Sequence, residues 1–222
     1  MGGGDEQHNE SGLETPIETL SGDAGLELPE FDSPPSDPLQ LLARWLDLAG
    51  ERGVREPLAL TLATAGADGR ASSRIVLLKG VWPELTFTSH HGSRKGRDLD
   101  AVPWAAGTLY WRETLQQVQL AGPVERLSEE ESDALFAARP RAAQAATLAS
   151  SQSAELTDPA LLRESAAAIA ASTEPLQRPR DWGGYRLVPE RIEFWHGSPD
   201  RLHRRLLYTK AADGWAPRRL QP

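Results

Sequence analysis

The chain has 222 residues, no cysteine, and 32 acidic against 24 basic residues, which give a formal net charge of −8 at pH 7. The missing cysteine excludes disulfides, iron–sulfur clusters, thiolate zinc sites and a cysteine nucleophile. No run of about 18 apolar residues is present, so we expect no membrane-spanning helix. Because the N-terminus also lacks a signal-peptide pattern, we expect a cytoplasmic protein.

The negative charge is concentrated at the N-terminus. Residues 1–37 contain ten acidic and no basic residues, which leaves the rest of the chain with 24 basic and 22 acidic residues. The segment is rich in Gly, Ser, Thr and Pro, so we interpret 1–37 as a disordered acidic tail, or as a lid that orders over a ligand, and 38–222 as the folded domain. The nearly neutral domain argues against nucleic-acid binding, which needs a clustered basic face.

The first half of the domain reads as one helix followed by strands. Asp37 and Pro38 form a helix N-terminus, apolar residues then repeat at helical spacing, and Gly53 ends the pattern. Alternating apolar and β-branched residues predict strands, the first two of which a Gly-rich turn joins as a hairpin. The predicted elements are strands at Leu58–Thr64, Ser73–Lys79, Leu85–Ser89, Ala105–Trp111 and Gln116–Arg126, with a short helix at Ser93–Leu99.

The second half begins with helices and returns to strands. Ser128 and Glu131 form a capping box, and Ala-rich helical composition continues to about Leu148. Because strands mostly follow one another instead of alternating with helices, we predict a mainly β fold of the α+β class, an antiparallel barrel with helices packed outside. The remaining predicted elements are a helix at Pro159–Ala171 and strands at Tyr185–Val188, Ile192–Trp195, Leu202–Tyr208 and Trp215–Leu220.

A basic cluster at a predicted helix start indicates an anion site. Arg94, Lys95 and Arg97 lie in the first turn of the helix expected at 93–99. Backbone N–H groups at a helix N-terminus bind phosphate well when Arg and Lys stand beside them. Arg74 and Lys79 bracket an apolar strand, and cations in such a stretch need partners. The alternative is a solvated basic helix end whose cations pair with protein carboxylates.

A second basic cluster lies near the C-terminus. On a strand, Arg201, His203 and Arg205 alternate onto one face, where they repel each other unless an anionic ligand or acidic residues lie opposite. The chain has no Gly-x-Ser-x-Gly elbow, no glycine-rich nucleotide-binding motif and no helical His spacing, so we expect neither a serine hydrolase nor a metal site. The residues alone predict an antiparallel barrel that binds a flat, phosphorylated, anionic ligand.

Nine short motifs, in order from about residue 37 to the end, resemble the pyridoxine/pyridoxamine 5′-phosphate oxidase family of flavoproteins. Within that family, softer similarities favour the flavin oxidase branch of phenazine biosynthesis. The family motifs are Arg74–Lys79, Gly92–Gly96, Gln116–Val118, Glu125–Leu127, Ala138–Pro140, Ser151–Ser153, Trp182–Tyr185, Ile192–Trp195 and Arg201–His203. The branch similarities lie at Leu28–Asp32, Asp37–Leu41, Arg55–Pro57, Pro103–Trp104, Leu109–Glu113 and Arg219–Pro222.

The resemblance implies an FMN-binding split antiparallel β-barrel and a homodimer with FMN at the subunit interface. Arg94 and Lys95 would hold the FMN phosphate, in agreement with the basic helix start. One subunit would contribute Arg74, Ile75, Val76, Leu77, Leu78, Lys79, Thr88, Ser89, Arg94 and Lys95 to the cofactor site, and the other would contribute Gln117, Gln152, Ser153, Trp195 and Arg205.

The resemblance also bears on the substrate. Vitamin-forming members grip the substrate phosphate with a Lys, a Tyr, an Arg and a Ser; here Lys79 and Arg139 match, but Leu135 and Ala143 replace the two hydroxyl residues. Each lost hydrogen bond is worth about 0.5–1.5 kcal/mol, or about 1.5–3 kcal/mol to a charged group, so phosphate binding would weaken. Arg201 and His203, the expected catalytic pair, would contact the substrate with Lys79 and Arg139.

We therefore expect an FMN-dependent oxidase that aromatises a reduced phenazine carboxylic acid precursor, uses O2 and releases H2O2. Lys79 and the Trp182–Tyr185 motif look more like the vitamin-forming branch, which keeps open a pyridoxine/pyridoxamine 5′-phosphate oxidase. A non-catalytic flavin-binding split-barrel module is also compatible with the motifs. So is a flavin- or deazaflavin-dependent reductase of the same superfamily.

Overall fold

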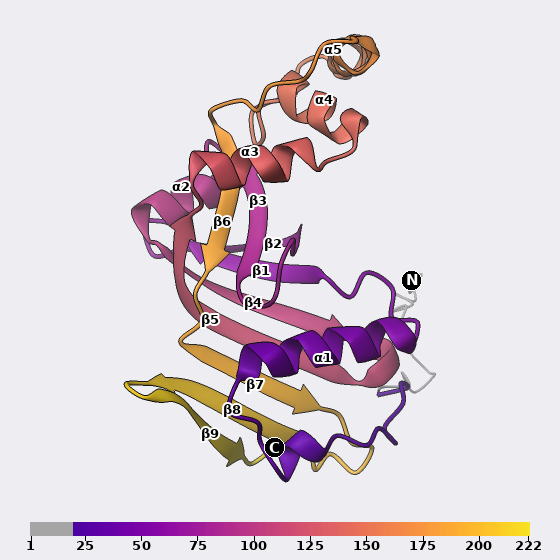
Figure 1. Ribbon diagram of the computed structural model, residues 1–222, viewed down its shortest axis with the longest axis vertical. Coiled ribbons are helices and arrows are strands. Elements are labelled where there is room, and N and C mark those ends of the chain that lie inside the picture. The colour runs from indigo at the N-terminus through magenta and orange to yellow at the C-terminus, as the bar shows by residue number, and fades with distance from the viewer. Residues whose placement is uncertain (1–19) are drawn as a thin grey trace, which may run out of the picture.

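Nine antiparallel strands make one strongly bent sheet in the computed structural model, which describes residues 20–222 (Figure 1). The main path runs β2-β1-β4-β5-β7-β8-β9, and β6 joins β5 to β3. This arrangement confirms the predicted antiparallel split barrel. The strands are β1 (Ala59–Ala65), β2 (Ala71–Leu77), β3 (Leu85–His90), β4 (Trp104–Trp111), β5 (Gln116–Arg126), β6 (Trp182–Leu187), β7 (Arg191–His196), β8 (Arg204–Ala211) and β9 (Gly214–Leu220).

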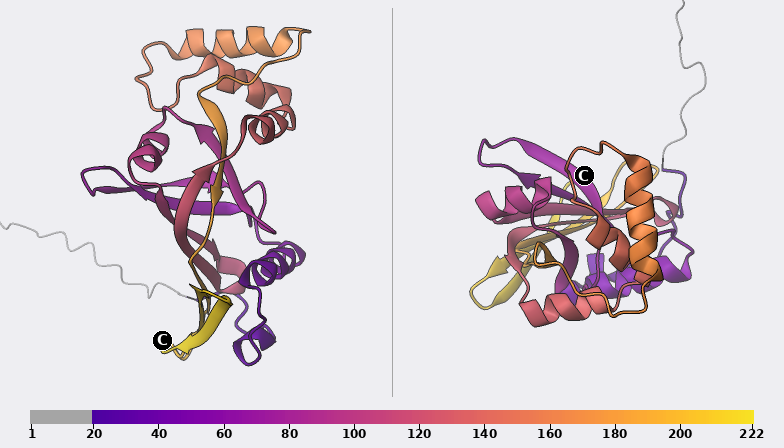
Figure 2. Two further views of the ribbon diagram at one scale, coloured as in Figure 1. Left: turned by 60° about the vertical axis from the view of Figure 1, so that its left-hand side comes forward. Right: turned by 90° about the horizontal axis from the view of Figure 1, so that it is seen from above.

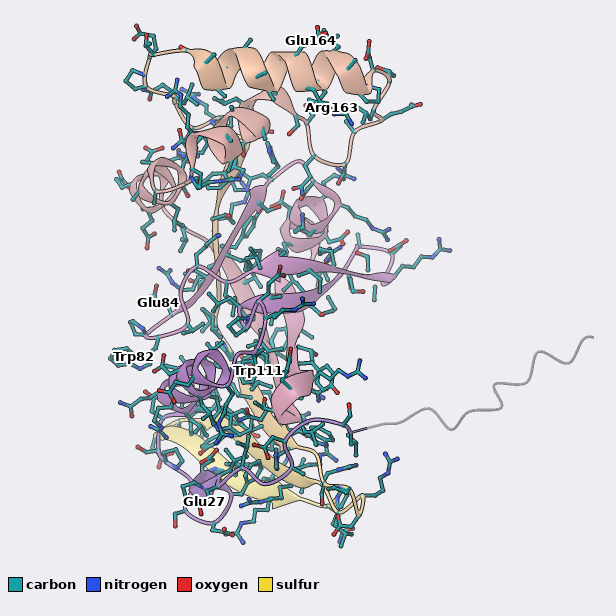
Figure 3. The ribbon with its side chains drawn as sticks, turned by 90° about the vertical axis from the view of Figure 1, so that its right-hand side faces the viewer. Glu27, Trp82, Glu84, Trp111, Arg163 and Glu164 are labelled. Atoms are coloured by element: carbon teal, nitrogen blue, oxygen red, sulfur yellow. The ribbon has the colours of Figure 1, made fainter. Side chains whose placement is uncertain are left out.

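Four of the α-helices form two separate groups with α2 between them, beside β1. The helix α1 (Pro38–Glu51) lies over the sheet near β7, whereas α3, α4 and α5 stack beyond the far end of β3 and β6 (Figures 1 and 2). In Figure 3, Arg163 and Glu164 mark α5 at one end and Glu27 marks the opposite end. The remaining helical elements are η1 (Pro29–Phe31), α2 (Arg94–Ala101), η2 (Arg112–Thr114), α3 (Glu129–Ala137), α4 (Arg141–Ala149) and α5 (Pro159–Ala171).

The main core forms where α1 covers the sheet. Asp37 caps the helix, since its carboxylate accepts from the backbone N–H of Leu39 at 2.8 Å. The buried ring of Trp45 meets Phe194 of β7 edge-on, with 4.9 Å between ring centroids, and Trp111 of β4 at 6.3 Å. Removing a ring of this size from a core costs about 3–5 kcal/mol, so α1 contributes to the stability of the fold.

Two differences between the predicted elements and the structure bear on the predicted site residues. The helix expected from residue 128 to about 148 is broken into α3 and α4, because Pro140 has no N–H to continue the first helix. The strand expected at 202–208 begins instead at Arg204. Arg201 has a left-handed backbone, with φ of +66°, so the predicted strand alternation of Arg201, His203 and Arg205 is wrong.

Residues 20–37, the described part of the segment interpreted as an acidic tail or lid, contact the folded domain. Leu26, Leu28 and Phe31 are buried in the main core, and η1 packs beside β8. Tyr208 of β8 donates its hydroxyl to the carbonyl of Pro35 at 2.9 Å. These buried apolar side chains anchor residues 26–31 to the domain. Residues 1–19 lie outside the described residues.

Within residues 20–222, no helix is long and apolar enough to cross a membrane.

Candidate cofactor and substrate site

A cavity of about 500 Å³ opens between the hairpin β1–β2, the strand β3 and the N-terminus of α2. Its lining mixes apolar and polar side chains with cations, which suits a flat ligand that carries an anionic group. Most of the residues predicted to bind the cofactor from one subunit line it. The lining residues are Ser72, Ser73, Arg74, Ile75, Val76, Leu77, Lys79, Thr88, Ser89, Arg94, Lys95, Gln152 and Ser153.

Lys95 is the most buried cation of the cavity, with 7% of its surface exposed. Its Nζ donates to Ser89 Oγ at 3.0 Å, Ser93 Oγ at 3.3 Å and Gln152 Oε1 at 3.3 Å. Among residues 20–222 no carboxylate pairs with it. Burial, and then the neighbouring Arg74, lower the pKa of Lys95. A buried ammonium group without an acidic partner favours an anionic ligand beside it.

Arg74 is held by a network that the sequence did not predict. Its guanidinium donates to Thr64 Oγ1 at 2.7 Å and Ser72 Oγ at 2.5 Å and lies 3.8 Å from Asp98. Thr64 and Ser72 face each other across the β1–β2 hairpin. Asp98, on α2, accepts from both hydroxyls, at 2.7 and 3.0 Å. The network fixes the cation at the cavity wall and ties α2 to the hairpin.

At the start of α2, the helix backbone lies close to the preceding turn at His91. Ser93 caps the helix as predicted, accepting from the Gly96 N–H at 3.3 Å. A Cβ at Gly96 would lie 2.0 Å from the carbonyl oxygen of His91, so only glycine fits there. The N–H of Arg94 donates to Ser153 Oγ at 3.2 Å, and Ser153 has a left-handed backbone, with φ of +72°. A non-glycine residue in this conformation is strained, which is common at binding sites.

Gln152 and Ser153 lie in the cavity of the chain that carries them. They were expected to reach the cofactor from the other subunit, yet they line the cavity of their own chain. The chain leaves the barrel after β5, forms α3 and α4, and returns through residues 150–158 to the N-terminus of α2. This return path brings residues about 60 positions apart into contact.

Three other predicted cofactor residues lie together away from the cavity. Gln117 on β5 pairs in register with Trp195 on β7, which pairs with Arg205 on β8. All three are half-buried and form one row on a single sheet face. Arg205 donates to the buried Glu193 at 2.7 Å, which raises the pKa of that guanidinium. Leu78, by contrast, is buried in the main core and does not line the cavity.

A second cavity of about 280 Å³ shares part of its wall with the first, and Arg139 is its cation. The guanidinium lies 5.0 Å from the ring centre of Trp182. Burial lowers the pKa of Arg139, and no acidic side chain in the described part of the chain pairs with it. The cavity is lined by Thr88, Ser89, His90, Arg139, Ala146, Thr147, Ser150, Gln152 and Trp182.

Neither Leu135 nor Ala143, which replace the two hydroxyl residues, adds a polar side chain to this region. Leu135 packs against the backbone of Gly184, where an added Cβ would lie 3.0 Å from Leu135 Cδ1. Ala143 offers only its carbonyl, which accepts from Thr147 Oγ1 at 2.9 Å. Thr147 and Trp182 were not predicted as individual site residues; their nearness to Arg139 follows from the break between α3 and α4.

Arg201 and His203 lie in the loop between β7 and β8 and line neither of the two cavities of their own chain. The ring of His203 packs against Trp195, with 4.8 Å between ring centroids. His203 therefore stands next to the row formed by Gln117, Trp195 and Arg205, and Arg201 lies in the same loop. The structure thus divides the predicted site residues into a cavity group and a sheet-face group.

Two family models match the chain. Residues 49–172 match the family described as pyridoxamine 5′-phosphate oxidase. Residues 182–222 match the pyridoxine 5′-phosphate oxidase C-terminal dimerisation region.

The chain is similar to curated proteins of two activities. It is 46% identical over 207 residues to a dihydrophenazinedicarboxylate synthase of Burkholderia lata, covering 93% of this chain and 98% of that protein. It is 48% identical over 201 residues to a pyridoxine/pyridoxamine 5′-phosphate oxidase of Burkholderia cenocepacia, covering 88% and 93%. Among solved structures, it resembles PhzG from Burkholderia lata 383 in complex with tetrahydrophenazine-1-carboxylic acid, with a TM-score of 0.88, 46% identity, and coverage of 90% of this chain and 100% of that chain.

Proposed function

Because the chain belongs to the pyridoxamine 5′-phosphate oxidase family, we propose that it is an FMN-dependent oxidase of a reduced phenazine carboxylic acid precursor. The enzyme would aromatise this substrate, with O2 as the electron acceptor and H2O2 as the second product. The match of residues 182–222 to a dimerisation region supports a homodimer.

The observation that carries the proposal is Lys95, buried beside the N-terminus of α2 without a carboxylate partner in residues 20–222. A phosphate fits this position, because Lys95 and Arg94 offer charge, and Ser89 and Ser93 offer hydroxyls. The exposed side chains of Ile75 and Leu77 beside it offer apolar surface for a flat ring system. The residues present therefore fit the phosphate and ring of FMN.

A second copy of the chain would complete the site. Gln117, Trp195 and Arg205 form a row on an open sheet face, away from the cavity of their own chain. In a homodimer, this row and the loop that carries Arg201 and His203 would face the cavity of the partner. The proposal places FMN at this interface, and the dimerisation-region match supports it.

Arg139 supports a substrate that carries a carboxylate. Its guanidinium is half-buried beside the cofactor cavity and stacks over Trp182, with no acidic partner among residues 20–222. A phosphorylated substrate would miss the two hydroxyls that Leu135 and Ala143 lack, at about 0.5–1.5 kcal/mol for each neutral hydrogen bond. A ring carboxylate needs fewer donors, and the relative named dihydrophenazinedicarboxylate synthase supports this class of substrate.

In this mechanism the chain binds and orients the substrate. Bound FMN supplies the two-electron acceptor and its return to the oxidised state with O2. Arg139 and Lys79 would hold anionic groups of the substrate at the cavity rim, and Arg201 and His203 would orient it from the partner subunit. The cations around the cavity, Arg74, Lys79, Arg94 and Lys95, would stabilise negative charge on a bound flavin.

The experiment is reconstitution with FMN followed by turnover. The full-length protein should take up FMN with a flavin absorbance spectrum, and should then consume O2 and form H2O2 with dihydrophenazine carboxylates. A protein that binds no FMN would refute the cofactor assignment. FMN binding without turnover of any reduced phenazine carboxylate or phosphorylated vitamer would instead favour a non-catalytic flavin module.

A pyridoxine/pyridoxamine 5′-phosphate oxidase is the second candidate. The 48% identity to such an enzyme favours it, and Lys79 and Arg139 are kept. Turnover of pyridoxamine 5′-phosphate, compared directly with the phenazine substrates, decides between the two. Efficient oxidation of the vitamer alone would reject the phenazine assignment.

A further inference from the structure

The loop between β7 and β8, residues 197–203, is built as a fixed unit. Gly197 donates its N–H to the carbonyl of Leu115 at 2.8 Å, and Arg201 donates to the carbonyl of Ser198 at 3.0 Å. The Asp200 carboxylate accepts from the Leu202 N–H at 2.9 Å and from the Ser198 hydroxyl. These contacts hold the backbone before any ligand arrives, so the side chains of the loop have a preset orientation.

Within this loop, the ring of His203 is fixed from two sides. The backbone N–H of Ser198 donates to His203 Nδ1 at 3.1 Å. The ring also packs against Trp195, with 4.8 Å between centroids and 48° between planes. A backbone N–H cannot accept a hydrogen bond, so Nδ1 must use its lone pair in this contact. In the neutral ring the proton then resides on Nε2.

From this geometry we infer that Ser198 is a positioning residue that sets His203 as a hydrogen-bond donor, not as a general base. The Nε2–H group is the remaining polar edge of the ring and can donate to an anionic or carbonyl oxygen of a substrate. If His203 took up a proton, Nδ1 would carry an N–H that faces the N–H of Ser198, and the hydrogen bond between Ser198 and His203 would be lost. That the donor meets a substrate rests on the proposed function; the tautomer itself does not.

The direct test is a measurement of the His203 tautomer in the FMN-loaded, full-length protein. Nitrogen-15 spectra of the imidazoles at about pH 8, where an ordinary imidazole is neutral, distinguish the two forms. His203→Gln assigns the signal by its loss. A proton on Nε2 is the expected result, and a proton on Nδ1 would overturn the inference. This readout needs no turnover, so it separates the inference from the proposed function.

Two variants of Ser198 form a matched pair for the same measurement. Ser198→Pro removes the N–H, and proline is compatible with the extended backbone expected before Pro199. Ser198→Ala keeps the N–H and removes only the hydroxyl contact with Asp200. We expect the alanine variant to keep the Nε2–H form and the proline variant to populate both forms. An unchanged tautomer in a folded, flavin-binding proline variant would show that Ser198 does not set it.

The catalytic consequence is tested by substitution of His203 itself. A glutamine amide can place an N–H near the position of Nε2 but cannot act as a base. His203→Ala should lower kcat/KM by roughly 10- to 100-fold, the range for a lost hydrogen bond to a charged group. His203→Gln should recover most of that loss. Equal losses in the two variants, with flavin binding intact, would reject the donor role.

Discussion

The two parts of the candidate site are built in different ways. The cavity is held by side chains of regular elements, such as Arg74, Thr64 and Asp98, which bond to one another across the hairpin and α2. The loop 197–203 is held mostly by backbone contacts and presents His203 from an irregular segment. In the cavity, a network of side chains fixes the position of the Arg74 guanidinium, whereas in the loop the backbone N–H of Ser198 orients the ring of His203.

The largest expected effect concerns charge in the cavity. Lys95→Met removes the buried ammonium group, and we expect FMN to bind roughly 10- to 100-fold more weakly, since a hydrogen bond to a charged group is lost. Flavin fluorescence titration measures the dissociation constant. Lys210→Met is the control, because Lys210 lies over Trp215 on the β8–β9 hairpin and lines neither cavity. Equal affinities of the two variants would contradict the role of Lys95.

The next effect concerns the backbone at the start of α2. Gly96→Ala places a Cβ against the carbonyl of His91, and overpacking of this kind costs about 1–3 kcal/mol. For a chain of this size the melting temperature should fall by roughly 2 to 10 °C. Gly92→Ala is the matched control, because no atom lies within 4 Å of its added Cβ. A melting temperature that is lower for Gly92→Ala than for Gly96→Ala would contradict the close contact between Gly96 and the His91 carbonyl.

The smallest effect sharpens the substrate assignment. Leu135→Tyr combined with Ala143→Ser restores the two hydroxyls of the vitamin-forming pattern, and we expect affinity for pyridoxamine 5′-phosphate to rise by roughly tenfold. Affinity for a dihydrophenazine carboxylate should change less. Steady-state kinetics with both substrates provides the comparison. No gain for the phosphorylated substrate would show that another part of the second cavity excludes it.

The cavity was more predictable from the sequence than the loop. Ser93, Arg94 and Lys95 carry a local signal, a cap followed by cations, and the structure places them together. The positions of Gln152 and Ser153 depend on how far the chain travels through α3 and α4, and no local pattern records that path.

In this loop, the alternating spacing of charged residues does not mark a strand. Arg201, His203 and Arg205 have the spacing of a strand face, but β8 begins only at Arg204. Pro199 and Asp200 are turn-forming residues and give the one local signal that the strand starts later. Similarly, alanine-rich composition outweighed Pro140 when a single helix was predicted in place of α3 and α4.

The pairing of β3 has a consequence for how the protein is made. Its ladder partner is β6, whose paired residues lie about 100 positions later in the chain, and β7 likewise adds to β5 across a long separation. On the ribosome, β3 therefore emerges well before the strand that completes its hydrogen bonds. Until β6 has been synthesised, this edge of β3 has no ladder partner in the chain, and an unpaired strand edge can pair with another chain.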